Sequence, residues 1–262
     1  MPFKLYHVDA FTDTMFTGNP AAVCLLTEPV SASWMEAVAR EMNLSETAFL
    51  QPRKDGYGLR WFTPKVEVSL CGHATLASAH ALFEEEAVPS SRTIAFHTKS
   101  GRLLARRRDD LIELDFPPRP PVATKPLKAL EAALGVSPKF TGRSKDDYLV
   151  EVEGEDELKR MAPDFAALAR VGTRGVIVTS PSKSKKYDFV SRFFAPAVGI
   201  NEDPVTGSAH CSLGPYWGAK LGMKEMVGYQ ASARGGVVEV RLQGGRVMLG
   251  GRAVTVTSGQ LR

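Results

Sequence analysis

The chain has 262 residues, of which 44% are hydrophobic and 24% charged, a composition typical of a globular protein and unlike a disordered or fibrous one. Its 33 basic and 29 acidic residues leave a net charge of +4, too small to indicate a nucleic-acid-binding surface. No stretch approaches the roughly 20 consecutive apolar residues of a membrane span. Three cysteines without CxxC spacing favour reduced thiols, so we expect a cytoplasmic protein.

The first half predicts a β-rich domain around one buried helix. A capping box formed by Ser33 and Glu36 predicts a helix that ends near Met42. Residues 73–87 form a helix that is apolar nearly all round, which belongs inside a domain. The predicted strands lie at residues 47–50, 58–62, 101–107 and 111–116.

Four prolines within residues 117–121 predict the boundary between two domains, because proline lacks the amide donor that a sheet requires. The second half is expected to repeat the plan of the first. It has a short helix at 127–134, strands at 148–152 and 175–179, a helix from Ser208 that Pro215 should kink, and a hairpin at 236–249. The predicted domains are 1–116, joined by a returning strand at 251–262, and 117–250.

An internal repeat supports this division. Residues 60–68 (RWFTPKVEV) reappear as residues 192–200 (RFFAPAVGI), and each copy leads to a glycine turn at the start of a helix, at Gly72 and at Gly207. One repeat of such length in 262 residues indicates a doubled domain rather than a solenoid. The predicted fold class is α+β, with two pseudo-symmetric domains that each form a β-rich, barrel-like shell around a central helix.

The two glycine turns indicate a binding site for an anion. A helix start has four backbone N–H groups without partners and about half a positive charge. Two such starts that face each other across a cleft would hold a carboxylate. The alternative is that both turns only cap buried helices.

Four separated motifs resemble the PhzF family of phenazine-biosynthesis-like isomerases over essentially the whole chain. They are residues 8–23 (VDAFT, then GNPAAV), 43–49 (NLSETAF), 60–75 and 202–210 (EDPVTGSAH). The resemblance implies the diaminopimelate epimerase-like fold, with the active site between two similar domains. It also implies cofactor-free isomerisation, which in the family's named member moves a proton between ring carbons of trans-2,3-dihydro-3-hydroxyanthranilate.

Glu46 is the residue that the resemblance assigns as the acid/base. It precedes a strand-like segment, and partial desolvation would raise the pKa of its carboxyl group toward the working pH. The corresponding strand of the second half, residues 173–177, has no acid, and a single base suits a hydrogen shift on one face of a substrate. The alternative is a glutamate at a strand edge that pairs with a neighbour.

By the same resemblance, His73 and Asp203 contact the substrate and tune the acid/base, while Ser208 and the amides of Gly72 and Gly207 hold a carboxylate or relay a proton. Asn19 is expected to bind the substrate, although it could equally be a turn residue before Pro20. His73 could instead be a helix-start residue whose ring bonds a carbonyl. His7 and His97 have no partner at metal spacing, so no metal site and no cofactor are predicted.

Two other functions stay open at this point. Amino-acid racemases of the same fold use one cysteine from each glycine turn, but only Cys71 stands at such a place, and Cys211 lies further along inside the second helix. Cys71 is then a small buried residue. A non-catalytic binding or scaffold protein is the second alternative, although it would have no use for the set of site residues. The expected partner is a small carboxylate-bearing substrate. The resemblance also implies a homodimer, which nothing in the sequence itself supports.

Overall fold

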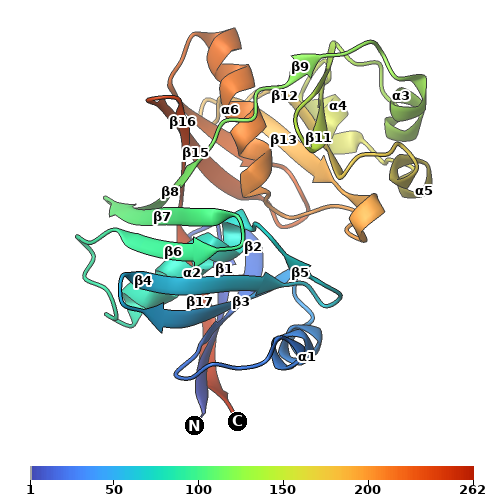
Figure 1. Cartoon of the computed structure of the whole chain (residues 1–262). Coiled ribbons are helices and arrows are strands. Elements are labelled where there is room, and N and C mark those ends of the chain that lie inside the picture. Colours follow the sequence, from blue (N-terminus) through green and yellow to red (C-terminus); the bar gives the residue numbers. More distant parts are fainter. Residues whose placement is uncertain (1) are drawn as a thin grey trace. The chain divides into compact units, whose positions relative to one another are not determined.

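The computed structural model describes residues 2–262, which form two compact units (Figure 1). Unit 1 consists of the chain up to Phe116 together with Met248–Arg262, and unit 2 consists of Pro117–Val247. Strand β16 (Arg246–Gly251) carries the chain from unit 2 back into unit 1. Among residues 2–262, no helix combines the length and the apolar character that crossing a bilayer requires.

Unit 1 contains two helices and a single series of paired strands. The elements are β1 (Phe3–Ala10), β2 (Asn19–Leu25), α1 (Ala32–Met42), β3 (Glu46–Arg53), β4 (Gly56–Phe62), β5 (Glu67–Val68), α2 (Gly72–Glu84), β6 (Ile94–Thr98), β7 (Gly101–Arg108), β8 (Leu111–Phe116) and β17 (Ala253–Leu261). The strands pair in the order β17–β1–β2–β3–β4–β6–β7–β8, with β5 beside β4. Only β2–β3 and β4–β6 in this series are parallel.

Unit 2 contains the elements β9 (Val122–Ala123), α3 (Lys128–Leu134), β10 (Phe140–Arg143), β11 (Asp147–Glu151), α4 (Glu155–Arg160), α5 (Phe165–Ala169), β12 (Gly175–Pro181), β13 (Phe189–Phe194), the 3-10 turn η1 (Pro196–Val198), α6 (Gly207–Leu221), β14 (Glu225–Gln230) and β15 (Gly236–Gln243). The strands pair in the order β9–β10–β11–β12–β13–β14–β15. The pairs β11–β12 and β13–β14 are parallel, and the other pairs in this order are antiparallel. Parallel and antiparallel pairs therefore occur in the same order as in the series β17–β1–β2–β3–β4–β6–β7 of unit 1.

The repeated segment makes the same contacts in both units. In unit 1 the guanidinium of Arg60 donates two hydrogen bonds of 2.8 Å to the Glu67 carboxylate and lies 5.0 Å above the Phe62 ring. In unit 2 Arg192 donates bonds of 2.7 and 2.8 Å to Glu202 and lies 4.9 Å above the Phe194 ring. The repeat noticed in the sequence is therefore also a repeat of side-chain geometry.

Helix α2 is the buried helix that the sequence predicts. It packs against β1, β2, β3, β7, β8 and β17, so that strands surround it (Figure 1). Its side chains are buried from His73 to Phe83 except His80, whose ring Nε2 lies 3.1 Å from the Thr255 hydroxyl. Alanines at four of these positions allow the surrounding strands to approach the helix axis closely.

The predicted second helix begins at Gly207 and continues through Pro215 without interruption. Pro215 cannot donate to the carbonyl oxygen of Cys211 four residues earlier. That oxygen instead accepts a hydrogen bond of 2.8 Å from the backbone N–H of Arg119. The polyproline segment after Phe116 thus supplies the donor that Pro215 lacks.

The predicted capping box at the start of α1 is wrong. The N-cap is Ser31, whose Oγ accepts a hydrogen bond of 3.2 Å from the Trp34 N–H, and Ser33 lies within the helix. Three serine or alanine residues precede Trp34, and the pattern alone did not distinguish Ser31 from Ser33. The predicted end at Met42 is confirmed, because Asn43 takes the left-handed conformation there.

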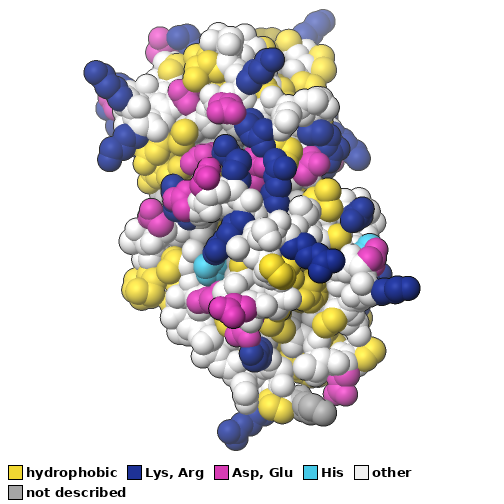
Figure 2. All heavy atoms as spheres, turned by 90° about the vertical axis from the view of Figure 1, so that its left-hand side faces the viewer, with side chains coloured by type: hydrophobic (Ala, Val, Ile, Leu, Met, Phe, Trp, Pro, Cys, Tyr) yellow, Lys and Arg dark blue, Asp and Glu magenta, His cyan; other side chains and the backbone are white. Residues whose placement is uncertain are grey.

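The basic run at the end of β7 neutralises a buried acid. Arg106 lies 2.7 Å and Arg108 lies 3.4 Å from the carboxylate of Glu113, whose side chain is 1% exposed. Asp109 and Asp110 form the turn between β7 and β8. On the face drawn in Figure 2, acidic side chains lie among the basic ones.

Gly56, the first residue of β4, lies directly against the backbone of β6. Its replacement tests whether the absence of a side chain there is required. Its φ is +140°, and a Cβ there would lie 2.2 Å from the backbone oxygen of Ala95. We expect Gly56→Ala to lower the free energy of unfolding by about 2 kcal/mol or more, measured by urea denaturation. Gly101→Ala is the matched control, because φ is +99° but no atom lies within 4 Å of the added Cβ. Equal losses in the two variants would contradict the steric explanation.

Candidate active site

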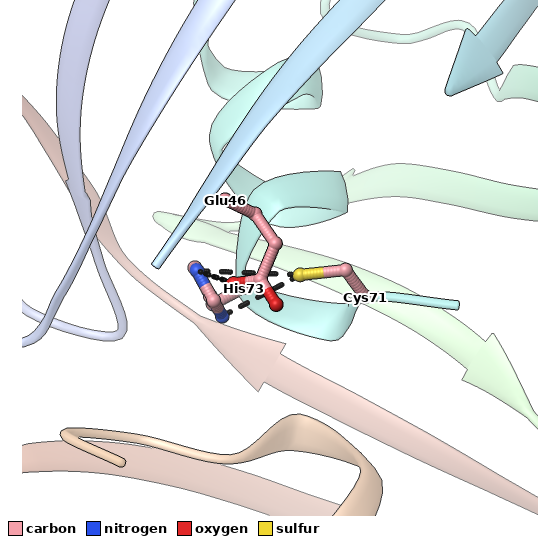
Figure 3. A group of neighbouring side chains, drawn as sticks. All are labelled: Glu46, Cys71 and His73. Carbon is pink, nitrogen blue, oxygen red and sulfur yellow. Dashed lines mark hydrogen bonds and ion pairs between the residues drawn. The ribbon is translucent and has the colours of Figure 1, made fainter. Parts of the chain in front are cut away.

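Three side chains that are expected to carry the chemistry meet within unit 1. Glu46 is the first residue of β3, Asn19 is the first residue of β2, and His73 is the second residue of α2. Because β2 and β3 are parallel, with Ala21 opposite Glu46, both strands begin at the same end of the sheet. The start of α2 lies at that end, and Figure 3 shows Glu46, Cys71 and His73 directed toward one another.

The contacts of this cluster are short and largely shielded from solvent. His73 Nε2 lies 3.2 Å from Glu46 Oε2, and the two side chains are 5% and 13% exposed. His73 Nδ1 lies 3.1 Å from Asn19 Nδ2, and Asn19 is fully buried. The Cys71 Sγ lies 3.6 Å from Nδ1 and 4.0 Å from Nε2 of the same ring.

Burial keeps the His73 ring neutral. It lowers the pKa of His73 to about 3, because no water compensates the charge of an imidazolium there. With Asn19 Nδ2 donating to Nδ1, the proton of the neutral ring is on Nε2. Nε2–H then faces Oε2 of Glu46 at 3.2 Å, a contact that fixes the direction in which the carboxylate points.

The second group of expected residues lies in unit 2, in front of α6. Asp203 accepts a hydrogen bond of 2.5 Å from the hydroxyl of Thr206, the N-cap residue of α6. The Gln230 side chain accepts from the Thr206 N–H at 2.9 Å and donates to the Asp203 carbonyl oxygen at 2.8 Å. Both Asp203 and Thr206 are 8% exposed. Gln230 therefore fixes the turn, a role that the sequence gave no reason to assign to it.

Ser208 is bonded to an arginine that sequence reasoning missed. Arg174 Nη2 donates to Ser208 Oγ at 3.2 Å and, together with Nε, to the Asp147 carboxylate at 2.5 and 2.9 Å. Burial acts to lower the pKa of Arg174, but the bonds to Asp147 and the charges of Asp147, Asp146 and Asp203 outweigh it, so the pKa is raised above its ordinary value and the guanidinium is fully charged. Arg174 stands just before β12, where no local pattern marks it as functional. Only the register of β12 beside β11 places it at the start of α6.

The register of the two units identifies the counterpart of Glu46. Phe49 is opposite Arg60 in β3–β4, and Val178 is opposite Arg192 in β12–β13. Counting three residues back from Phe49 and from Val178 leads to Glu46 and to Gly175. A Cβ on Gly175 would lie 2.3 Å from the Phe193 ring, so any side chain in place of the acid would require that ring to move.

The glycine turns are where the sequence places them, since Gly72 and Gly207 are the first residues of α2 and α6. Cys71 and Thr206 are the corresponding N-cap residues. Asn19 is fully buried, and its side-chain amide contacts the ring of His73, which is another residue of the site. That both clusters act on one substrate stays a prediction.

Comparison with known proteins gives a consistent result. A family model described as phenazine biosynthesis-like protein matches residues 8–259. An uncharacterized isomerase of Halalkalibacterium halodurans is 54% identical, over 100% of this chain and 99% of the relative. A crystal structure of a PhzF family protein from Enterococcus faecalis has a TM-score of 0.96 at 41% identity and covers 100% of both chains. A hydroxyproline epimerase from Agrobacterium vitis shares the fold, with a TM-score of 0.64 at 12% identity over 99% of this chain and 92% of its own.

Fold and relatives together define an isomerase of the α+β, diaminopimelate epimerase-like class. Within that class, the chain belongs to the PhzC–PhzF family of phenazine biosynthesis-like proteins. The family resemblance and the fold class inferred from the sequence motifs are both confirmed.

Proposed function

We propose that this isomerase moves a proton between two carbons of a small carboxylate-bearing metabolite, with Glu46 as its single acid/base. The observation that carries the proposal is the Glu46–His73 pair. A largely buried carboxylate lies 3.2 Å from Nε2 of a neutral imidazole, an arrangement that positions a base beside a group that does not protonate it.

In the proposed reaction, the ionised Glu46 removes a proton from a carbon made acidic by a neighbouring unsaturated or carboxylate group. The electron pair of the broken C–H bond forms a new double bond, and the existing double bond shifts along the chain or ring. Glu46 then returns the same proton to the carbon at the far end. No oxidant or reductant is required, because the product is an isomer of the substrate.

The arrangement of thiols disfavours the alternative of a two-cysteine racemase. Thr206 occupies the N-cap position in unit 2 that Cys71 occupies in unit 1. Cys211 lies one turn into α6, and burial raises the pKa of its thiol to about 12. A thiol that stays protonated in this way is a poor base.

We propose that Arg174 and Ser208 bind the carboxylate of the substrate. Arg174 is held charged by Asp147, and Ser208 is half-buried at the second position of a 15-residue helix, whose N-terminus favours negative charge. The hydroxyproline epimerase of the same fold was solved with trans-4-hydroxy-L-proline, itself a carboxylate, which motivates this choice of ligand class.

Ser208→Ala tests the role of unit 2. Loss of one hydrogen bond to a charged carboxylate costs about 1.5–3 kcal/mol, so we expect KM to rise by about 10- to 150-fold with kcat little changed. Steady-state kinetics provide the measurement. Ser212→Ala, one turn further along α6, is the control, because the structure gives the Ser212 hydroxyl no hydrogen-bond partner among residues 2–262. An unchanged KM in Ser208→Ala would remove this residue from substrate binding.

The reaction itself is tested in two stages. Small unsaturated and cyclic carboxylic acids are first screened for stabilisation against heat, since a ligand of the native state raises the Tm by mass action. Each stabilising acid is then incubated with the enzyme in D2O and followed by NMR. Migration of a double bond supports the proposal. Inversion of an α-carbon without migration would replace it with a racemase.

Three further statements are proposed with this function, the first two resting on the family resemblance and the third on the internal repeat. We infer that the reaction needs no cofactor, that the protein is a homodimer, and that the two units arose by internal duplication. The matched senses of pairing and the matched Arg60 and Arg192 contacts support the duplication. Turnover after exhaustive dialysis against EDTA tests the first statement, and sedimentation equilibrium tests the second.

A further inference from the structure

The Glu46 cluster unites three donor atoms of the kinds that Zn²⁺ binds. A ring nitrogen of His73, the sulfur of Cys71 and a carboxylate oxygen of Glu46 all lie within 4.8 Å of one another (Figure 3). They come from β3 and from the start of α2, so their spacing in sequence matches no local metal motif. For this reason the sequence led to the expectation that no metal site exists.

The distances fit tetrahedral coordination. With Zn–N and Zn–O near 2.1 Å and Zn–S near 2.3 Å, the edges of a tetrahedron are about 3.4 Å between N and O and about 3.6 Å between N and S. The corresponding distances from His73 Nε2 are 3.2 Å to Glu46 Oε2 and 4.0 Å to Cys71 Sγ. The third edge, between the Glu46 oxygen and the Cys71 sulfur, is at most 4.8 Å, so side-chain movements of up to about an ångström would complete three corners and leave a fourth open.

Charge and orientation also suit a divalent cation. An ionised Glu46 and a Cys71 thiolate cancel the two positive charges, and neutral His73 contributes a lone pair, so the loaded cluster is electrically neutral. Neutrality matters because Cys71 is only 6% exposed and the His73 side chain 5%. When Nε2 binds the metal, the ring proton is on Nδ1, and Asn19 accepts it through its amide oxygen after a half-turn of the amide.

We propose that Glu46, Cys71 and His73 form a reversible Zn²⁺ site, and that bound Zn²⁺ stops turnover by occupying the carboxylate that must accept the proton. Binding displaces the thiol proton of Cys71 to solvent and involves no change of oxidation state. Only the inhibitory part rests on the proposed function, because the donor set exists whatever reaction the enzyme performs.

Cobalt reports directly on the sulfur ligand. Metal-free, full-length protein is titrated with Co²⁺ under reducing conditions, and we expect a thiolate-to-cobalt charge-transfer band that saturates at one equivalent and is removed by Zn²⁺. Cys71→Ser should abolish the band, and Glu46→Gln should weaken binding of Co²⁺ by on the order of 100-fold. Cys24→Ala is the matched control, because Cys24 is another buried cysteine of unit 1 outside any disulfide and should leave the band unchanged.

Absence of the band at excess Co²⁺, or its persistence in Cys71→Ser, would overturn the site. If Cys71→Ser does not fold, Glu46→Gln alone decides, and undiminished affinity in that variant rejects the assignment. In the activity arm, one equivalent of Zn²⁺ should reduce turnover by at least about tenfold and EDTA should restore it, while retained turnover in the Zn²⁺-loaded enzyme would overturn inhibition. A stoichiometric cobalt band in a protein without isomerase activity would refute the proposed function and leave the metal site standing.

Discussion

Glu46→Gln should abolish turnover while the protein remains folded. The amide has nearly the shape of the carboxylate but cannot accept a proton from carbon, and loss of a general acid/base costs about 10²–10⁴ in rate. His73 can still donate Nε2–H to the amide oxygen, so the 3.2 Å contact has a substitute. The rate of double-bond migration and the urea midpoint should be measured on the same preparation.

Glu67→Gln is the matched control for this loss of activity. Glu67 is also a partly buried glutamate of unit 1, with its side chain 14% exposed, and Arg60 and Lys99 bind it. Hydrogen bonds to Arg60 are the main reason that its pKa is lowered to about 2. Its neutralisation should lower stability by about 1–3 kcal/mol and leave kcat within a few-fold. Equal losses of activity in the two variants would show that Glu46 acts through the fold rather than in the reaction.

The protein should lose stability steeply as the pH falls from 6 to 4.5. Burial lowers the pKa of His73 to about 3 and of His210 to about 4. Below the ordinary histidine pKa of about 6.5, both rings therefore take up protons only in the unfolded chain, so ν_U exceeds ν_N and the free energy of unfolding rises with pH. Each ring contributes about 1.4 kcal/mol per pH unit, which gives a loss of about 3–4 kcal/mol over this window.

Urea denaturation at several pH values checks this expectation. His210→Gln should reduce the slope by about 1.4 kcal/mol per pH unit, because the ring whose Nδ1 now donates to the Thr206 carbonyl oxygen at 2.9 Å no longer titrates. The window stays above pH 4.5 because carboxylates with a lowered pKa, such as Glu67, add a loss of the same sign at lower pH. An unchanged slope in His210→Gln would show that this ring is protonated in the native state.

Those parts of the fold were predictable that depend on the composition of one short segment. The all-apolar helix at 73–87 needed a shell of strands, and four prolines after Phe116 had to end regular structure. The short strands β5, β9 and β10 were not predicted, since they have little hydrophobic pattern of their own. They exist because neighbouring strands offer unpaired backbone groups.

The site residues that lie within a family motif were predictable from the sequence. Those that only the folding of the chain brings to the site were not. Glu46, His73 and Asp203 lie within motifs. Arg174 reaches Ser208 only because β12 lies beside β11, and nothing in its own neighbourhood indicates this. The convergence of Cys71 with Glu46 likewise depends on where β3 begins relative to α2, which spacing along the chain does not encode.

The pairing of β17 with β1 has a consequence for how the protein is made. Phe3 is opposite Leu261, so the first and last strands of the chain are neighbours in unit 1. During synthesis, β1 can pair with β2 early, but its pairing with β17 has to wait until residues 253–261 leave the ribosome, whereas every strand pair between Val122 and Gln243 emerges earlier. Unit 2 can thus form its strand pairs on the nascent chain before the half that carries Glu46 receives β17.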